Sequence, residues 1–124
     1  MARISFNAAA LVGTAVLLFG AVEALAHAFL DHATPAVGST VHGSPSELSL
    51  WFTQELEPAF STVQVVDQAG REVDKGDKAV DPGDRTLLKV SLPALPPGTY
   101  KVIWRVLSVD THTTEGDFKF TVAP

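Results

Sequence analysis

Hydrophobic and polar residues alternate along five short segments of the chain, residues 48–52, 62–66, 87–92, 99–107 and 117–122. In the longest segment the apolar side chains fall at every second position, with Lys101 and Arg105 between them. A period of two with many β-branched and aromatic residues is typical of strands that have one buried face. The pattern therefore predicts a protein built mainly from short β-strands.

Turn-forming residues recur between these segments, as in Asp81-Pro82-Gly83-Asp84 and Pro96-Pro97-Gly98. Regularly spaced strands with Gly- and Pro-rich turns favour an all-β sandwich or barrel, of the cupredoxin or immunoglobulin type. No segment after residue 26 has a convincing helical period, and Pro58 limits residues 55–60 to a short helical turn. We expect seven bulky residues to form the core: Trp51, Phe52, Phe60, Tyr100, Trp104, Phe118 and Phe120.

The first 26 residues have a different character. Arg3 is followed by an uncharged apolar run over residues 4–22 and then by the small-residue motif Ala24-Leu25-Ala26. These three features describe a secretory signal peptide. We expect a cleavable signal helix at residues 1–26 and one domain at residues 27–124. The alternative is a retained membrane anchor, because the run is about as long as the ~17–25 residues that span a bilayer.

Composition narrows the function of the domain. Cleavage would remove one basic residue, Arg3, and one acidic residue, Glu23, so the net charge of −5 would not change. An acidic domain argues against nucleic acid as a partner and is compatible with binding a cation. The chain has no cysteine, and its single methionine is Met1. Nitrogen and oxygen ligands without sulfur favour Cu(II) over Cu(I).

His27 would be the first residue after cleavage behind Ala26. A free N-terminal histidine offers its α-amine and its imidazole Nδ1 to one metal ion, and such a chelate suits the tetragonal geometry of Cu(II). Ala26-His27-Ala28 is also a possible cleavage motif, and a cut behind Ala28 would remove this ligand. We favour Ala26 because the apolar run ends near Val22.

Asp110 and His112 follow the longest predicted strand. Residues two apart in an extended segment project to the same side, so a carboxylate and an imidazole could meet at one ion. A capping Asp beside an exposed His is the structural alternative. His32 could assist or form a weaker site, whereas His42, in a turn, is expected to face solvent.

The mature sequence resembles the CopC family of small periplasmic copper-binding proteins. The resemblance begins at His27, continues through Leu50-Trp51-Phe52-Thr53, and ends in Gly116-x-Phe118-x-Phe120-x-Val122. Its most specific part is the motif Trp104-Arg105-x-x-Ser108-x-Asp110-x-His112. The resemblance implies a Greek-key β-sandwich in the periplasm and one Cu(II) ion per chain, bound by His27, Asp110 and His112. It also implies a role in copper resistance or uptake beside a membrane partner of the CopD type.

Two departures from the family pattern bear on the site. Some members have a Glu ligand directly after the Phe-Ser/Thr pair, where this chain has Gln54, and Glu55 comes one position later. The contribution of Glu55 stays open. Other members have a methionine-rich loop for Cu(I), which residues 27–124 lack. We therefore expect a protein that binds Cu(II) only.

A copper carrier or buffer without enzymatic activity is the function that the sequence favours. The first alternative is a copper-dependent oxidative enzyme of the polysaccharide monooxygenase type, which also uses an N-terminal His. Such enzymes need a larger chain with a flat binding face, and we expect no carbohydrate ligand here. The second alternative is a structural sandwich that binds no metal.

Overall fold

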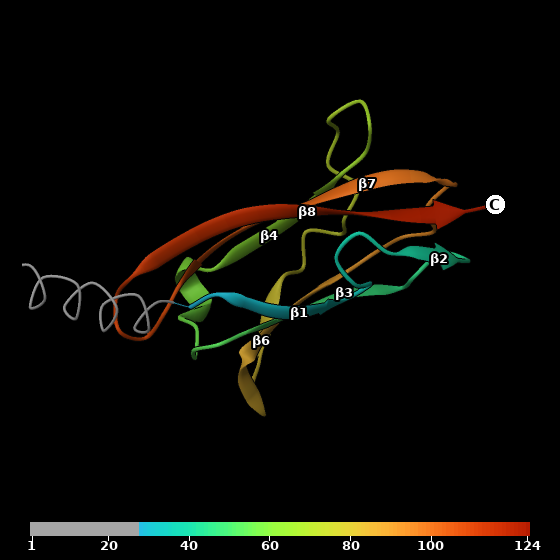
Figure 1. The fold of residues 1–124 in the computed structure, drawn as a ribbon. Helices are drawn as coiled ribbons and strands as arrows, with labels where there is room; N and C mark the ends of the chain where they lie inside the picture. Colours follow the sequence, from blue (N-terminus) through green and yellow to red (C-terminus); the bar gives the residue numbers. More distant parts are fainter. Residues whose placement is uncertain (1–27) are drawn as a thin grey trace, which may run out of the picture.

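The computed structural model describes residues 28–124, which form two four-stranded β-sheets packed face to face (Figure 1). The first sheet has the strand order β1-β3-β6-β5, and the second has the order β2-β8-β7-β4. In chain order the elements are β1 (Leu30–Thr34), β2 (Thr40–His42), β3 (Glu47–Phe52), the 3₁₀ turn η1 (Pro58–Phe60), β4 (Thr62–Val66), β5 (Ala79–Asp81), β6 (Asp84–Ser91), β7 (Gly98–Leu107) and β8 (Thr113–Ala123).

The predicted all-β Greek-key sandwich is confirmed. The chain crosses between the sheets from β1 through β4, and the hairpins β5–β6 and β7–β8 then complete one sheet each. The only helical element among the described residues is η1, at the proline that was expected to limit a helix. The predicted signal helix lies outside the described residues. Within residues 28–124, no helix has the length and apolar character needed to cross a bilayer.

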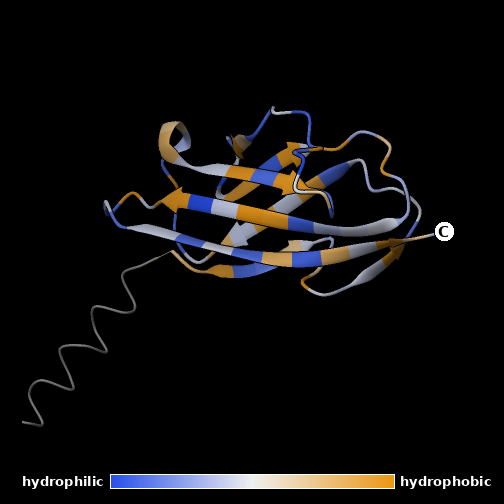
Figure 2. Cartoon of the chain, turned by 90° about the horizontal axis from the view of Figure 1, so that it is seen from above, coloured by the Kyte–Doolittle hydropathy of each residue, from blue (hydrophilic) through white to orange (hydrophobic). Residues whose placement is uncertain are grey.

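The core lies between the two sheets, and the alternation along the strands determines it. In β7 the buried side chains are those at the even positions 100–106, as the pattern predicted. Figure 2 shows the same alternation of hydrophobic and hydrophilic positions along the strands. Five of the seven expected core residues are buried: Phe52, Tyr100, Trp104, Phe118 and Phe120.

Two expected core residues were assigned wrongly. Phe60 is 68% exposed, because η1 lies outside the two sheets and none of its residues is buried. Trp51 is half-buried on the outer face of the first sheet, where its ring stacks on His32 with centroids 4.5 Å apart. Both errors have one cause. The prediction relied on the size and hydrophobicity of the side chain, whereas burial depends on where the residue lies. Trp51 points away from the core because its neighbours Leu50 and Phe52 point toward it, and Phe60 lies outside both sheets.

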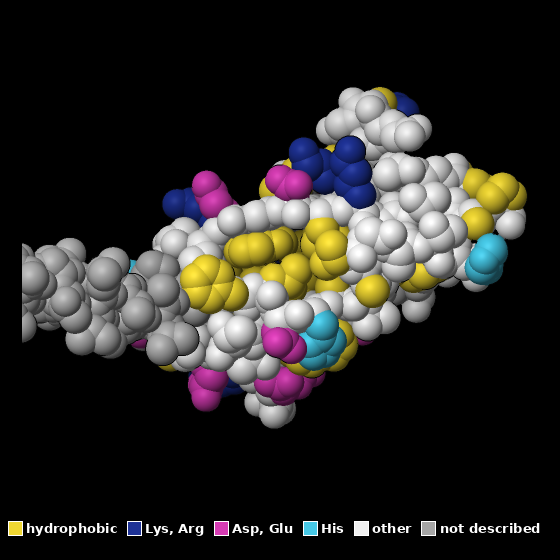
Figure 3. Space-filling model, viewed as in Figure 1, with side chains coloured by type: hydrophobic (Ala, Val, Ile, Leu, Met, Phe, Trp, Pro, Cys, Tyr) yellow, Lys and Arg dark blue, Asp and Glu magenta, His cyan; other side chains and the backbone are white. Residues whose placement is uncertain are grey.

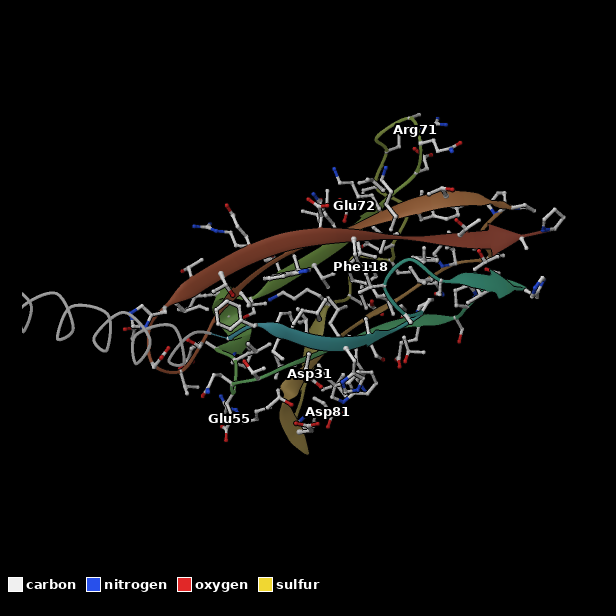
Figure 4. All side chains as sticks on the ribbon, in the orientation of Figure 1. Asp31, Glu55, Arg71, Glu72, Asp81 and Phe118 are labelled. Carbon is white, nitrogen blue, oxygen red and sulfur yellow. The ribbon has the colours of Figure 1, made fainter. Side chains whose placement is uncertain are left out.

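Three strands were not predicted from the sequence, namely β1, β2 and β5. Each has at most five residues, and each has at most one buried residue. These strands form through backbone pairing with longer neighbours, and a hydrophobic period does not mark them. Among residues 28–124, the short β2 pairs only with Thr121–Ala123 of β8. Hydrophobic side chains are therefore visible between β1 and the rest of β8 (Figure 3). Phe118, labelled in Figure 4, is one of the buried side chains that fill the space between the sheets.

Trp104 depends on a glycine in the neighbouring strand. Trp104 pairs with Gly116 across β7 and β8, and its ring also meets Phe52 edge to face at 5.2 Å. A Cβ atom on Gly116 would lie 2.6 Å from Cζ2 of Trp104. Such a distance is far inside van der Waals contact, so the indole ring occupies the space that the missing side chain leaves.

We predict that Gly116→Ala lowers the free energy of unfolding by about 1–3 kcal/mol, the usual cost of overpacking a core. Urea denaturation measures this change. The control is the same substitution in a Trp104→Leu background, where the smaller side chain leaves room for the new methyl group. An equal loss of stability in both backgrounds would contradict the steric explanation, because a double-mutant cycle isolates the contact between the two side chains.

Candidate metal centre

One end of the sandwich brings together the start of the described chain, the segment between β3 and η1, and the turn between β7 and β8 (Figure 1). Phe29 and Thr53 exchange two hydrogen bonds of 2.9 Å: the Phe29 N–H donates to Oγ1 of Thr53, and the Thr53 N–H donates to the Phe29 carbonyl. The N–H of Val109 donates to the carbonyl of Glu55 at 3.0 Å. The segment between β3 and η1 is thus hydrogen-bonded both to the start of the described chain and to the turn between β7 and β8.

The turn between β7 and β8 has Asp110 at its centre. The Ser108 N–H donates to the His112 carbonyl at 3.0 Å, and the Thr111 N–H donates to the Ser108 carbonyl at 2.9 Å. Thr111 has a φ of 73°, in the left-handed region that β-branched residues rarely adopt. A left-handed residue commonly closes a three-residue hairpin loop. Asp110 and His112 are therefore brought together by a tight turn, and the extended segment expected from their spacing is not present.

The hydroxyl of Ser108, at the start of this turn, contacts the carboxylate of Asp110. Ser108 is fully buried, and its Oγ donates a hydrogen bond to Oδ1 of Asp110. The backbone N–H of His112 reaches the same carboxylate oxygen at 3.3 Å. The bond from Ser108 is the main cause that lowers the pKa of Asp110 below its usual value, and His112 adds to the effect. The carboxylate therefore stays ionised at lower pH than an ordinary aspartate.

The second oxygen of Asp110 faces the imidazole of His112. Oδ2 of Asp110 and Nδ1 of His112 are 3.4 Å apart, and both side chains are partly exposed. Two atoms that each bind one metal ion at about 2 Å can be at most about 4 Å apart. The observed separation fits two neighbouring ligands of one ion. A carboxylate oxygen and an imidazole nitrogen are also a donor set that Cu(II) accepts.

The first described residue is bonded to the strand that follows this turn. Oγ1 of Thr114 donates to the carbonyl of Ala28 at 2.6 Å, and Ala28 is fully buried. Thr114 is only two residues beyond His112. The start of the domain and the Asp110–His112 turn are consequently neighbours in space. His27 itself lies outside the described residues.

The other candidate ligands do not join Asp110 and His112. Across residues 28–124, no three His, Asp or Glu side chains are grouped so that they could hold a metal ion. The ring of His32 stacks on Trp51, and its Nδ1 lies 2.7 Å from Oδ2 of Asp31. Glu55, labelled in Figure 4, extends its carboxylate to within 4.0 Å of Nε of Arg85. His42 is exposed on β2, as expected.

Comparison with known proteins decides the family. Residues 30–123 match the model of the CopC domain. The chain belongs to the CopC family. A relative named copper resistance protein C, from Pseudomonas syringae pv. tomato, is 36% identical over 118 residues, which cover 86% of this chain and 93% of the relative.

Solved structures of CopC proteins have the same fold. The crystal structure of CopC from Methylosinus trichosporium OB3b matches with a TM-score of 0.71 and 37% identity, over 79% of this chain and 95% of that one. PcoC, described as a methionine-rich copper resistance protein from Escherichia coli, matches with a TM-score of 0.68 and 31% identity, over 78% and 99% of the two chains. Family membership connects this CopC protein with copper handling, and copper is the metal that its site would bind.

Ser108 and Thr114 contact the candidate metal centre, but neither of them was given a role from the sequence. Ser108 is part of the motif that carries the family resemblance, and its spacing from Asp110 and His112 was a usable signal. Thr114 extends the same spacing by one step, at positions 108, 110, 112 and 114. Its contact with Ala28 joins residues 86 positions apart, so no local pattern could have indicated it.

Proposed function

We propose that this CopC protein carries one Cu(II) ion, bound by the α-amine and imidazole of His27 together with Asp110 and His112. The observation that supports this site is the hydrogen bond from Thr114 to Ala28. Consecutive Cα atoms are about 3.8 Å apart, so the residue before Ala28 begins within reach of the Asp110–His112 turn. The free amine and the imidazole of His27 would supply the remaining two nitrogen ligands.

The same contacts favour cleavage behind Ala26 over cleavage behind Ala28. Ala28 is buried, and its carbonyl accepts a hydrogen bond from Thr114. The backbone of Phe29 makes two hydrogen bonds with Thr53. A cut behind Ala28 would remove a residue that is part of the folded domain. We therefore propose residues 1–26 as the signal peptide and the periplasm as the destination of residues 27–124.

The proposed cargo is Cu(II) because the domain offers no sulfur. Its ligands are nitrogen and oxygen atoms, and the only methionine of the chain is Met1. PcoC, by contrast, is described as rich in methionine. Thioether ligands select Cu(I), and imidazole, amine and carboxylate suit Cu(II). A carrier that holds a single oxidation state is the simplest function for such a site.

A role as carrier is proposed in preference to enzymatic activity. A groove of ≈ 770 Å³ lies on the outer face of β4, β7 and β8, and neither Asp110 nor His112 lines it. A copper-dependent oxidase of polysaccharides would need its substrate face at the metal. The carboxylate of Asp110 would also occupy a coordination position that oxygen requires.

Exposed apolar side chains near the centre support a protein partner. Phe29, Phe60 and Val109 are 49%, 68% and 45% exposed. Phe29 and Val109 are hydrogen-bonded to Thr53 and Glu55, and Phe60 is the last residue of the same segment, residues 53–60. Apolar residues gathered at one place on a soluble domain are typical of an interaction surface. We propose that a membrane transporter of the CopD type docks on this surface and exchanges copper with the centre.

Protein exported through its own signal should begin at His27 and bind one Cu(II) ion tightly, because cleavage creates the amine ligand. Intact mass spectrometry and Cu(II) titration measure both properties, and His112→Ala should weaken binding strongly. A mass that begins at Phe29 would contradict the site. So would a His112→Ala variant that binds Cu(II) as tightly as the parent.

Thr114→Val should weaken Cu(II) binding about tenfold, in the range seen when groups that orient metal ligands are lost. The change keeps the shape of the side chain and removes the hydroxyl that holds Ala28. The control is Thr121→Val, at the end of the same strand away from the Asp110–His112 turn, where the hydroxyl lies 3.2 Å from that of Thr99. Competition with a chelator of known affinity measures the two variants, and equal affinities would refute the tethering role.

Phe60→Ser should slow copper exchange with membrane vesicles that contain the CopD-type transporter, and Cu(II) affinity should not change. Phe60 is exposed, so its loss removes docking surface without opening the core. Val37→Ser is the control, because Val37 is 59% exposed in the connection between β1 and β2. Equal exchange rates for the two variants would place the docking surface elsewhere.

A further inference from the structure

We propose that Ser108 is a positioning residue for copper: its buried hydroxyl holds Oδ1 of Asp110, so that Oδ2 becomes the ligand oxygen, and it keeps His112 in register with that oxygen. The inference rests on the proposed copper site and adds a residue that has no metal-binding atom of its own. It concerns the rigidity of the apo site, before the metal arrives.

The single hydrogen of the Ser108 hydroxyl goes to Asp110. Oγ of Ser108 lies close to Oδ1 of Asp110 and 3.1 Å from the carbonyl of His112. A hydroxyl has one hydrogen to donate, and the His112 carbonyl already accepts the Ser108 N–H at 3.0 Å. The carboxylate is the stronger acceptor because it is charged. The backbone of Ser108 therefore holds His112, and its side chain holds Asp110.

Both donors in the turn act on the same carboxylate oxygen. Oδ1 of Asp110 accepts from the Ser108 hydroxyl and faces the His112 N–H at 3.3 Å. Oδ2 of the same carboxylate lies 3.4 Å from Nδ1 of His112. Two donors on one oxygen fix the rotation of the carboxylate about its own axis. Oδ2 is left pointing at the place where an imidazole ligand would share the ion, which favours binding through one oxygen.

The position of Ser108 makes this arrangement rigid. Ser108 has no exposed surface, and its backbone is bridged to Leu56 in the neighbouring segment. By comparison, the side chains of Asp110 and His112 are 37% and 46% exposed. The two candidate ligands are thus exposed at the surface, whereas the residue that positions them is buried. A ligand held in its binding geometry before the metal arrives loses less conformational freedom on binding.

Ser61 provides a matched control. It is also fully buried, and its hydroxyl exchanges hydrogen bonds of 3.2 and 3.4 Å with the backbone of Leu107, the residue before Ser108. Ser61→Ala and Ser108→Ala therefore each remove one buried hydroxyl beside the end of β7. Of the two hydroxyls, only that of Ser108 contacts a candidate ligand.

The experiment compares these two variants with the parent, each with its mature N-terminus, by Cu(II) competition titration, by the electron paramagnetic resonance spectrum of the Cu(II) complex and by urea denaturation of the apo protein. We expect both variants to lose apo stability. Only Ser108→Ala should lose affinity, by about 10–100-fold as for other groups that orient metal ligands, and only its spectrum should change. In an Asp110→Ala background, Ser108→Ala should cause no further loss, because it acts through that carboxylate.

Two outcomes would overturn the proposal: Ser108→Ala matching Ser61→Ala in affinity and spectrum, or a full further loss in the Asp110→Ala background. A second pair of variants, Ser108→Thr and Ser108→Val, separates the role of the hydroxyl from an effect on folding. Threonine and valine have nearly the same volume, and only threonine has a hydroxyl. The threonine variant should keep the parental spectrum and the valine variant should not. If the proposed copper site itself is wrong, the parent and Asp110→Ala should bind Cu(II) equally weakly, which distinguishes this failure from failure of the role of Ser108.

Discussion

The antiparallel pairing of β7 with β8, which runs without interruption from Gly98 and Val122 to Leu107 and Thr113, is the constraint on which the rest of the structure depends. Its register places Gly116 opposite Trp104, and the indole ring fills the space above the glycine. The same register brings the chain to its turn with Asp110 at the centre. A shift of one residue would reverse every side chain between core and solvent, so the core and the ligand pair depend on one pairing.

The turn combines rigidity with an unfavourable backbone conformation. Thr111 occupies the left-handed region at a φ of 73°, where glycine or asparagine is the usual choice. Strained conformations persist where the surroundings fix them, and they are common at functional sites. Here the fixing groups are the backbone and hydroxyl of Ser108. The result is a short loop whose carboxylate and imidazole are close together before any ion binds.

The two sides of the proposed site differ in how they are held. Asp110 and His112 are oriented within one hairpin, whereas the start of the domain is attached from outside by Thr114 and Thr53. In the proposed site, a copper ion held by a terminal His27 would join these two parts. Because a terminal His27 would bring its own amine, the proposed site offers nitrogen-rich coordination without sulfur ligands. The exposed apolar residues around this end form the surface on which we propose that a transporter docks.

The sequence by itself determined the longer strands, the buried side of β4, β7 and β8, and the closeness of Asp110 and His112, because a period of two and a short spacing are local properties of the chain. It could not determine β1, β2 and β5, which form through pairing with distant strands, or the outward position of Trp51 and the exposure of Phe60. It named Asp110 and His112 but gave them an extended backbone. Only the tertiary structure decided that a left-handed Thr111 and a buried Ser108 bring them together and that Thr114 holds Ala28 beside them, because these contacts depend on how the folded chain returns on itself.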